Sequence, residues 1–167
     1  MKKYCLTDKI RVDGHTLYRI RALIDIPEYG VKAGDLGGFV GGENNLSQDD
    51  SCWISDNATV YGKAKVFGNA RVYGNAAVYD EAQIYDNAQV YNEAIICGRA
   101  KIYDNAKVFG AAWVYDDACV YDNAWVYDDA TINGCAEVYG TAIICNTAQI
   151  YGAARISDGI YDGGTYS

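Results

Sequence analysis

Residues 58–81 read ATVYGK, AKVFGN, ARVYGN and AAVYDE, which are four versions of one hexapeptide. The unit continues without an insertion. Ala occupies every sixth position from Ala58 to Ala154, and Val or Ile follows two residues later in every unit. The next position is usually Tyr or Phe, and the one after it is Gly, Asp or Asn in every unit. Seventeen consecutive units therefore dominate this chain of 167 residues.

The six-residue period predicts an all-β fold. The Ala and the Val of one unit lie two positions apart, so both point to the same side of a short strand, and the Tyr points to the other side. Gly, Asp and Asn tolerate the left-handed backbone region and supply the turn that follows. An amphipathic helix would need a period of 3.6 residues, and a pentapeptide solenoid would need five. We therefore expect a parallel β-coil.

The repeat resembles the hexapeptide-repeat, left-handed parallel β-helix superfamily. Val60–Ala64 and Val72–Ala76 have the aliphatic-x-Gly-x-small pattern of that superfamily. The resemblance implies a left-handed triangular prism with three hexapeptides, or 18 residues, in each coil. The seventeen units would then form about six coils. The lead-in, residues 31–54, is similar to that of bacterial and phage hexapeptide-repeat proteins that are often labelled transferases without a demonstrated activity.

Three segments are expected along the chain. Residues 1–53 form an N-terminal hairpin and cap, in which Asp13-Gly14 supplies a two-residue hairpin turn. Residues 54–157 form the hexapeptide-repeat β-helix, and residues 158–167 form a C-terminal tail that closes the other end. Caps are expected because the ends of a solenoid must hide their open strand edges.

Composition restricts the function classes. The net charge of −8 disfavours direct binding to nucleic acid. No apolar run is long enough for a membrane span, and no signal peptide is visible, so we expect a protein of the bacterial cytoplasm without a membrane contact. The single histidine, His15, is expected to be a turn residue away from the coil. We predict neither a cofactor nor a bound metal.

Residues 18 apart should stack, and the outward pairs of one face then include no charged side chain. This first face carries the candidate interface with a protein partner or with a second copy, as a dimer or trimer. Large exposed apolar patches are unusual on a monomer, and Trp and Tyr anchor interfaces. The candidate residues are Ala77, Tyr79, Ile95, Cys97, Trp113 and Tyr115. The alternative is that stacked aromatic rings only stabilise the sheets.

A second candidate surface is acidic. Residues 108–154 contain no Lys or Arg. Carboxylates in regular rows would attract a basic partner surface. The candidate residues are Asp116, Asp117, Asp122, Asp128 and Asp129. The alternative is a solvated face that keeps the protein soluble.

Two further patterns have structural interpretations. Asp86, Asp104 and Asp122 lie 18 apart and resemble a calcium ladder, although Asp is also an ordinary turn residue. No two of the six cysteines are 18 apart and no C-x-x-C motif occurs, so free thiols are expected.

Three functions are compatible with these observations. The first is a non-catalytic, rigid, acidic binding module, of the kind a phage or prophage could use to inhibit a host defence protein or nucleic-acid-binding protein. The second is an acyltransferase-like protein, but the superfamily's enzymes use a catalytic His on the coil, and no repeat here contains one. The third is a self-assembling structural protein. We expect the first, with no catalytic residue.

Overall fold

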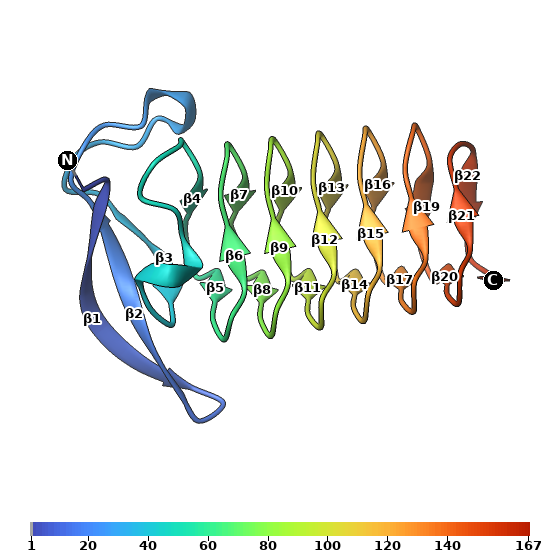
Figure 1. Ribbon diagram of the computed structural model, residues 1–167, viewed down its shortest axis with the longest axis horizontal. Coiled ribbons are helices and arrows are strands. Elements are labelled where there is room, and N and C mark those ends of the chain that lie inside the picture. Colours follow the sequence, from blue (N-terminus) through green and yellow to red (C-terminus); the bar gives the residue numbers. More distant parts are fainter. Residues whose placement is uncertain (1) are drawn as a thin grey trace.

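The computed structural model describes residues 2–167 and is a parallel β-solenoid of about seven turns (Figure 1). Its strands form three sheets that run along the solenoid axis. Two 3₁₀ turns are the only helical elements of the described chain, η1 (Pro27–Tyr29) and η2 (Glu43–Asn45). No helix among these residues has the length and apolar character needed to cross a membrane.

The three sheets differ in their number of strands. The ten-stranded sheet contains β1 (Tyr4–Val12), β2 (His15–Ala22), β3 (Leu36–Val40), β5 (Thr59–Val60), β8 (Ala77–Val78), β11 (Ile95–Ile96), β14 (Trp113–Val114), β17 (Thr131–Ile132), β20 (Gln149–Ile150) and β23 (Thr165–Tyr166). The six-stranded sheet contains β6 (Lys65–Val66), β9 (Gln83–Ile84), β12 (Lys101–Ile102), β15 (Cys119–Val120), β18 (Glu137–Val138) and β21 (Arg155–Ile156). The seven-stranded sheet contains β4 (Trp53–Ile54), β7 (Arg71–Val72), β10 (Gln89–Val90), β13 (Lys107–Val108), β16 (Trp125–Val126), β19 (Ile143–Cys145) and β22 (Ile160–Asp162).

The expected 18-residue register is confirmed within the repeats. Ile95 pairs with Ala77 on one side and with Trp113 on the other, and the other two sheets keep the same spacing. The Ala and Val or Ile columns point inward, and nearly every member is fully buried. Burial of these small and branched side chains, at roughly 25 cal/mol per Å² of apolar surface, supplies the main stabilisation of the solenoid.

One backbone conformation explains why Gly, Asp or Asn recurs at the turn position of each unit. At every sixth position from Asp56 to Gly152 the residue is Gly, Asp or Asn and adopts a positive φ of 50–71°. Only Gly, Asn and Asp occupy this left-handed region readily. The same backbone geometry therefore turns the chain at each corner of the solenoid.

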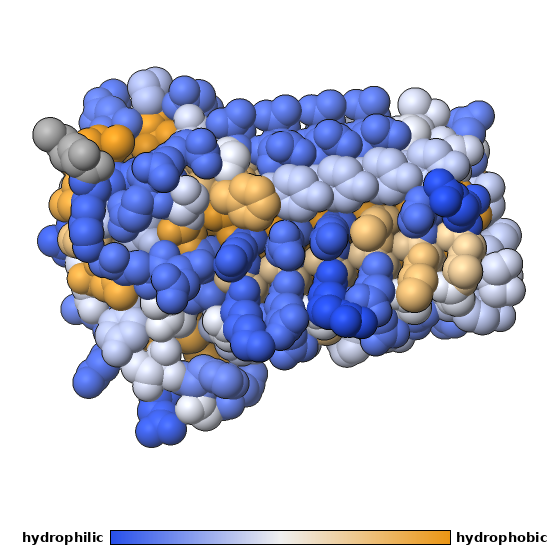
Figure 2. Space-filling model, viewed as in Figure 1, coloured by the Kyte–Doolittle hydropathy of each residue, from blue (hydrophilic) through white to orange (hydrophobic). Residues whose placement is uncertain are grey.

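Aromatic rings stack between successive turns, as the sequence predicts. One row runs through Phe67, Tyr85, Tyr103, Tyr121 and Tyr139 with ring centroids 4.9–5.1 Å apart, on the side of the solenoid that Figure 2 presents. The row on the seven-stranded sheet is also continuous, from Tyr73 to Tyr127. On the ten-stranded sheet only Tyr61 and Tyr79 stack in this way, because Cys97 follows them in the column.

The expected count of about six coils is too low, because segments outside the strict repeat also wind into the solenoid. Phe39 of β3 pairs in parallel with Thr59, and Leu46 forms a parallel bridge with Val66. Both spacings are 20 residues rather than 18, so the hexapeptide period does not predict this turn. At the other end, β22 and β23 pair with β19 and β20.

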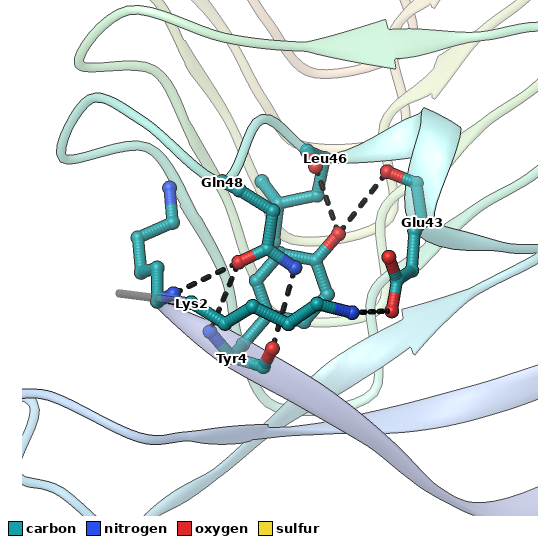
Figure 3. Close-up of polar contacts among 6 residues, drawn as sticks. Lys2, Tyr4, Glu43, Leu46 and Gln48 are labelled. Atoms are coloured by element: carbon teal, nitrogen blue, oxygen red, sulfur yellow. Dashed lines mark hydrogen bonds and ion pairs between the residues drawn. The ribbon is translucent and has the colours of Figure 1, made fainter.

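The N-terminal hairpin forms around Asp13-Gly14, and its second strand continues the ten-stranded sheet beyond β3. Its first residues are fixed to the first turn (Figure 3). The Tyr4 hydroxyl donates to the carbonyl of Leu46 at 2.8 Å, and the Gln48 side chain bonds both the N–H and the C=O of Tyr4. The Lys3 ammonium is buried and donates to three backbone carbonyls, including that of Cys52 at 3.0 Å.

Candidate functional site

The first face is the outer surface of the ten-stranded sheet. Its six candidate residues come from three adjacent strands and the corners that follow them, so the structure brings all of them together. Trp113 is 50% exposed and stands at the end of this group. Ile95 and Ala77, its neighbours along the column, are half-buried. The group forms a flat strip of apolar and aromatic side chains without a charged member.

Two polar groups of this strip, those of Tyr79 and Cys97, have a raised pKa. Burial raises the pKa of the Tyr79 hydroxyl well above its usual value, and its hydrogen bond with Cys97 adds to the shift. Burial also raises the pKa of the Cys97 thiol. Neither group carries a charge near neutral pH, so the strip offers no nucleophilic thiolate.

The five acidic candidates do not form one cluster, because they lie on three different corners. Asp116 and Asp117 follow β14, at the corner between the ten-stranded and six-stranded sheets. Asp128 and Asp129 precede β17, at the opposite edge of the ten-stranded sheet. Asp122 lies at the corner between the other two sheets. Four of the five thus border the first face, two on each side, and Asp122 does not.

Most of these carboxylates also have a partner within the chain. Asp116, Asp122 and Asp128 occupy the left-handed turn position, and each accepts a hydrogen bond from a backbone N–H of the next turn, at 3.0–3.4 Å. Asp117 forms an ion pair with Arg99 at 2.6 Å. Asp129 is exposed. It lines a shallow groove of about 740 Å³ together with Asn75, Glu93 and Ala111, among others.

The ladder of Asp86, Asp104 and Asp122 has the same structural role. The carboxylates of Asp86 and Asp104 each accept a hydrogen bond from the backbone N–H of the next Asp in the column. That of Asp122 accepts one from Gly140 at 3.0 Å. Within residues 2–167, no three His, Cys, Asp or Glu side chains are grouped as metal ligands. The column is accounted for by turn geometry.

The expectation that His15 lies away from the coil is wrong. The hairpin tip bends back, and the His15 ring lies 5.0 Å from the ring of Tyr61 at the first corner of the repeats. The two rings are tilted by 41°. This contact fixes the hairpin tip beside one edge of the first face.

The arginines of β2, at the N-terminal end of the ten-stranded sheet, were not among the predicted site residues. Arg19 of β2 pairs with Phe39, and its guanidinium lies 4.8 Å from the centroid of the Phe39 ring. Because Phe39 pairs with Thr59, Arg19 continues the outward column of the first face. The alternation of Arg19 and Arg21 on β2 is the signal that could have placed both on one side of a strand.

The six cysteines are all free thiols, as the sequence predicts. They are Cys5, Cys52, Cys97, Cys119, Cys135 and Cys145.

Comparison with known proteins supports the fold. The model of a family described as YdcK beta solenoid repeat matches residues 64–80 and 82–98, each covering nearly three hexapeptides. No curated protein matches the chain. The repeat segment of this protein is thus similar to the YdcK beta solenoid repeat, and the chain as a whole is an all-β parallel solenoid.

Proposed function

We propose that the chain is a non-catalytic binding module that acts through protein–protein contacts, with the first face as its docking surface. The observation that carries this proposal is the half-exposed Trp113 in a flat, uncharged strip. Aromatic residues with a large exposed area are the usual anchors of interfaces. Successive hydrogen-bonded turns keep the strip rigid, so little conformational entropy would be lost on docking.

The acidic borders of the strip favour a basic partner. Asp116 and Asp117 lie on one side of it and Asp128 and Asp129 on the other. Such a frame attracts a positively charged surface and increases the association rate. A host protein with a basic groove, such as a defence or nucleic-acid-binding protein in the bacterial cytoplasm, has this chemistry. The resemblance to phage and prophage hexapeptide proteins, with their left-handed coils and N-terminal caps, supports the role of an inhibitor.

Two other functions have weaker support. A self-assembling structural protein is favoured by the last turn, where β21, β22 and β23 each stand at the end of their sheet. An acyltransferase would need a base on the coil, whereas the single His lies at the hairpin tip.

Capture experiments with two tryptophan variants test the proposal. Trp113→Lys places a charge in the first face, whereas Trp125→Lys makes the same change on the seven-stranded sheet, where Trp125 is 41% exposed. We expect immobilised wild type and Trp125→Lys to retain one defined protein from bacterial lysate, and Trp113→Lys to lose it. Equal capture by both variants would exclude the first face as the docking surface. Thermal stabilisation by coenzyme A would instead indicate the acyltransferase.

A further inference from the structure

Four of the six Lys and Arg residues between positions 58 and 154 line one shallow groove of about 530 Å³. The groove lies along the six-stranded sheet and its corner with the ten-stranded sheet, on the side of the solenoid that Figure 2 presents. Its cations are Lys63, Lys65, Arg99 and Lys101. The same segment of sequence holds eleven carboxylates, yet only two of them line the groove. This acidic protein therefore has one locally basic groove.

The two carboxylates of the groove are neutralised within the chain. Lys63 Nζ lies 2.7 Å from Oε1 of Glu81, and Arg99 Nη2 lies 2.6 Å from Oδ2 of Asp117. Two further carboxylates of this corner accept hydrogen bonds from backbone N–H groups and do not line the groove; they are Asp80 and Asp116. The corner thus uses its own cations internally.

Lys65 and Lys101 supply the two positive charges that remain. They lie on β6 and β12, and Gln83 of β9 lies between them, paired with Lys65 on one side and with Lys101 on the other. Both lysines are exposed, and all three side chains face outward. At ~4.8 Å per strand the two lysine Cα atoms are roughly 10 Å apart. Each ammonium, on its flexible four-carbon stem, can therefore reach the space above the Gln83 amide.

The seven-stranded sheet contains the same column of cation, Gln and cation, and there the cations have partners. The column consists of Arg71, Gln89 and Lys107. The Arg71 guanidinium lies 4.6 Å from the centroid of the Tyr29 ring, and the Lys107 ammonium lies 4.8 Å from that of Trp125. Within residues 2–167, the corresponding lysines of the six-stranded sheet have neither an ion pair nor an aromatic ring as partner. The same pattern is thus satisfied internally on one sheet and open to a ligand on the other.

We propose that Lys65, Gln83 and Lys101 bind the phosphate group of a small molecule. A phosphate monoester carries a charge of about −1.5 to −2 near neutral pH, which matches two ammonium groups, whereas a single carboxylate would balance only one. Its three terminal oxygens can accept hydrogen bonds from both ammonium groups and from the Gln83 amide. The groove volume is in the range of small-molecule sites. This site lies on the six-stranded sheet and does not depend on the proposed docking surface of the first face.

Phosphate titrations followed by NMR of isotope-labelled protein test the site. The probes are inorganic phosphate and glycerol phosphate, each added at constant ionic strength. We expect saturable shifts of the Gln83 signals, with a dissociation constant on the order of 1 mM for a site of two charge-assisted contacts. Lys65→Gln with Lys101→Gln should weaken the binding by about tenfold or more. Tighter binding of glycerol phosphate would identify a phosphate ester as the ligand, and equal binding of the two probes would identify the free ion.

The column on the seven-stranded sheet provides the matched control. Arg71→Gln with Lys107→Gln makes the same change of net charge, so we expect its dissociation constant to stay within about twofold of wild type. Circular dichroism melting checks that both double variants are folded.

Three results would overturn the proposal. The first is a wild type that shows no saturable shift with either probe. The second is unchanged binding by the variant with Lys65→Gln and Lys101→Gln. The third is an equal loss of binding in both double variants, because the anion would then respond only to the net charge of the protein.

Discussion

The carboxylate of Asp116 accepts a hydrogen bond from the backbone N–H of Gly134, 18 residues later, at 3.2 Å. The same contact joins Asp80 to Gly98 and Asp122 to Gly140. Each of these Asp residues holds a left-handed turn and also satisfies a backbone donor of the next turn. The acidic corners are therefore part of the structure that holds successive turns together.

Substitutions at Asp116 should separate these two roles. Asp116→Asn keeps a side-chain acceptor and tolerates the left-handed backbone, so we expect its free energy of unfolding to stay within about 0.5 kcal/mol of wild type. Asp116→Ala loses the hydrogen bond and places a methyl side chain at φ 57°, so we expect a loss of about 1–3 kcal/mol. Urea denaturation followed by circular dichroism measures both.

Asp129→Ala is the control for that experiment. Asp129 is exposed and does not have a positive φ, so the change should alter stability by less than about 0.5 kcal/mol. If Asp116→Ala were as stable as Asp129→Ala, the bond to Gly134 would not contribute to folding.

The inward Val column gives a second prediction. Val90 is fully buried, and Val90→Asp would place an unpaired carboxylate in the core. We expect this change to cost several kcal/mol and to unfold the protein or lower its melting temperature sharply. Gln89→Asp, one residue earlier on the same strand, faces outward and is the matched control. A Val90→Asp protein that melts like Gln89→Asp would contradict the inward assignment.

The fold could be predicted because the six-residue and 18-residue periods of the sequence are also the periods of the structure. The six-residue spacing defines strand and turn, and the 18-residue spacing pairs Ile95 with Ala77 and Trp113. The first turn was not predicted, since Phe39 and Thr59 are 20 residues apart and lie outside that period. The apolar strip was predicted as a set for the same reason as the fold.

The rest of the candidate surface depends on contacts that no local pattern encodes. The exception is the corner of Asp122, which the 18-residue register already separates from that of Asp116, six residues earlier. The position of Arg21 on the same sheet depends on the antiparallel pairing of β2 with β3. The contact of His15 with Tyr61 depends on how far the hairpin bends.

The acidic residues that border the first face should contribute to partner binding, and those on other corners should not. If a partner docks on the first face, changing Asp116, Asp117, Asp128 and Asp129 to Asn should weaken its binding, whereas Asp122→Asn should not, since Asp122 lies on the far corner. Binding should also weaken from about 50 to about 500 mM salt, which shortens the screening length roughly threefold. Calorimetric titration at the two salt concentrations measures both effects. Salt-insensitive binding that survives the fourfold change would leave only the apolar strip as the contact.

The tyrosine row on the six-stranded sheet predicts a loss of stability at high pH. Burial, together with the hydrogen bond that the Tyr121 hydroxyl donates to the Glu137 carboxylate at 3.0 Å, raises the pKa of Tyr121 to about 12. In the unfolded chain the same group titrates near its ordinary value of 10.0. The unfolded state therefore releases its proton first, so the stabilisation is complete below about pH 10 and is lost as the pH rises toward about 12.

Tyr121→Phe tests this assignment, because it keeps the stacked ring and removes the titrating hydroxyl. We expect the free energy of unfolding of wild type to be constant from about pH 8 to 10 and to fall above pH 10, and that of Tyr121→Phe to fall less steeply. Tyr85 and Tyr103 stack in the same row and also have raised pKa values, so the variant should reduce the slope without abolishing it. Urea denaturation at a series of pH values gives the slopes. Identical slopes for the two proteins would mean that the Tyr121 hydroxyl titrates alike in the folded and unfolded states, and the contact with Glu137 would then have no weight in solution.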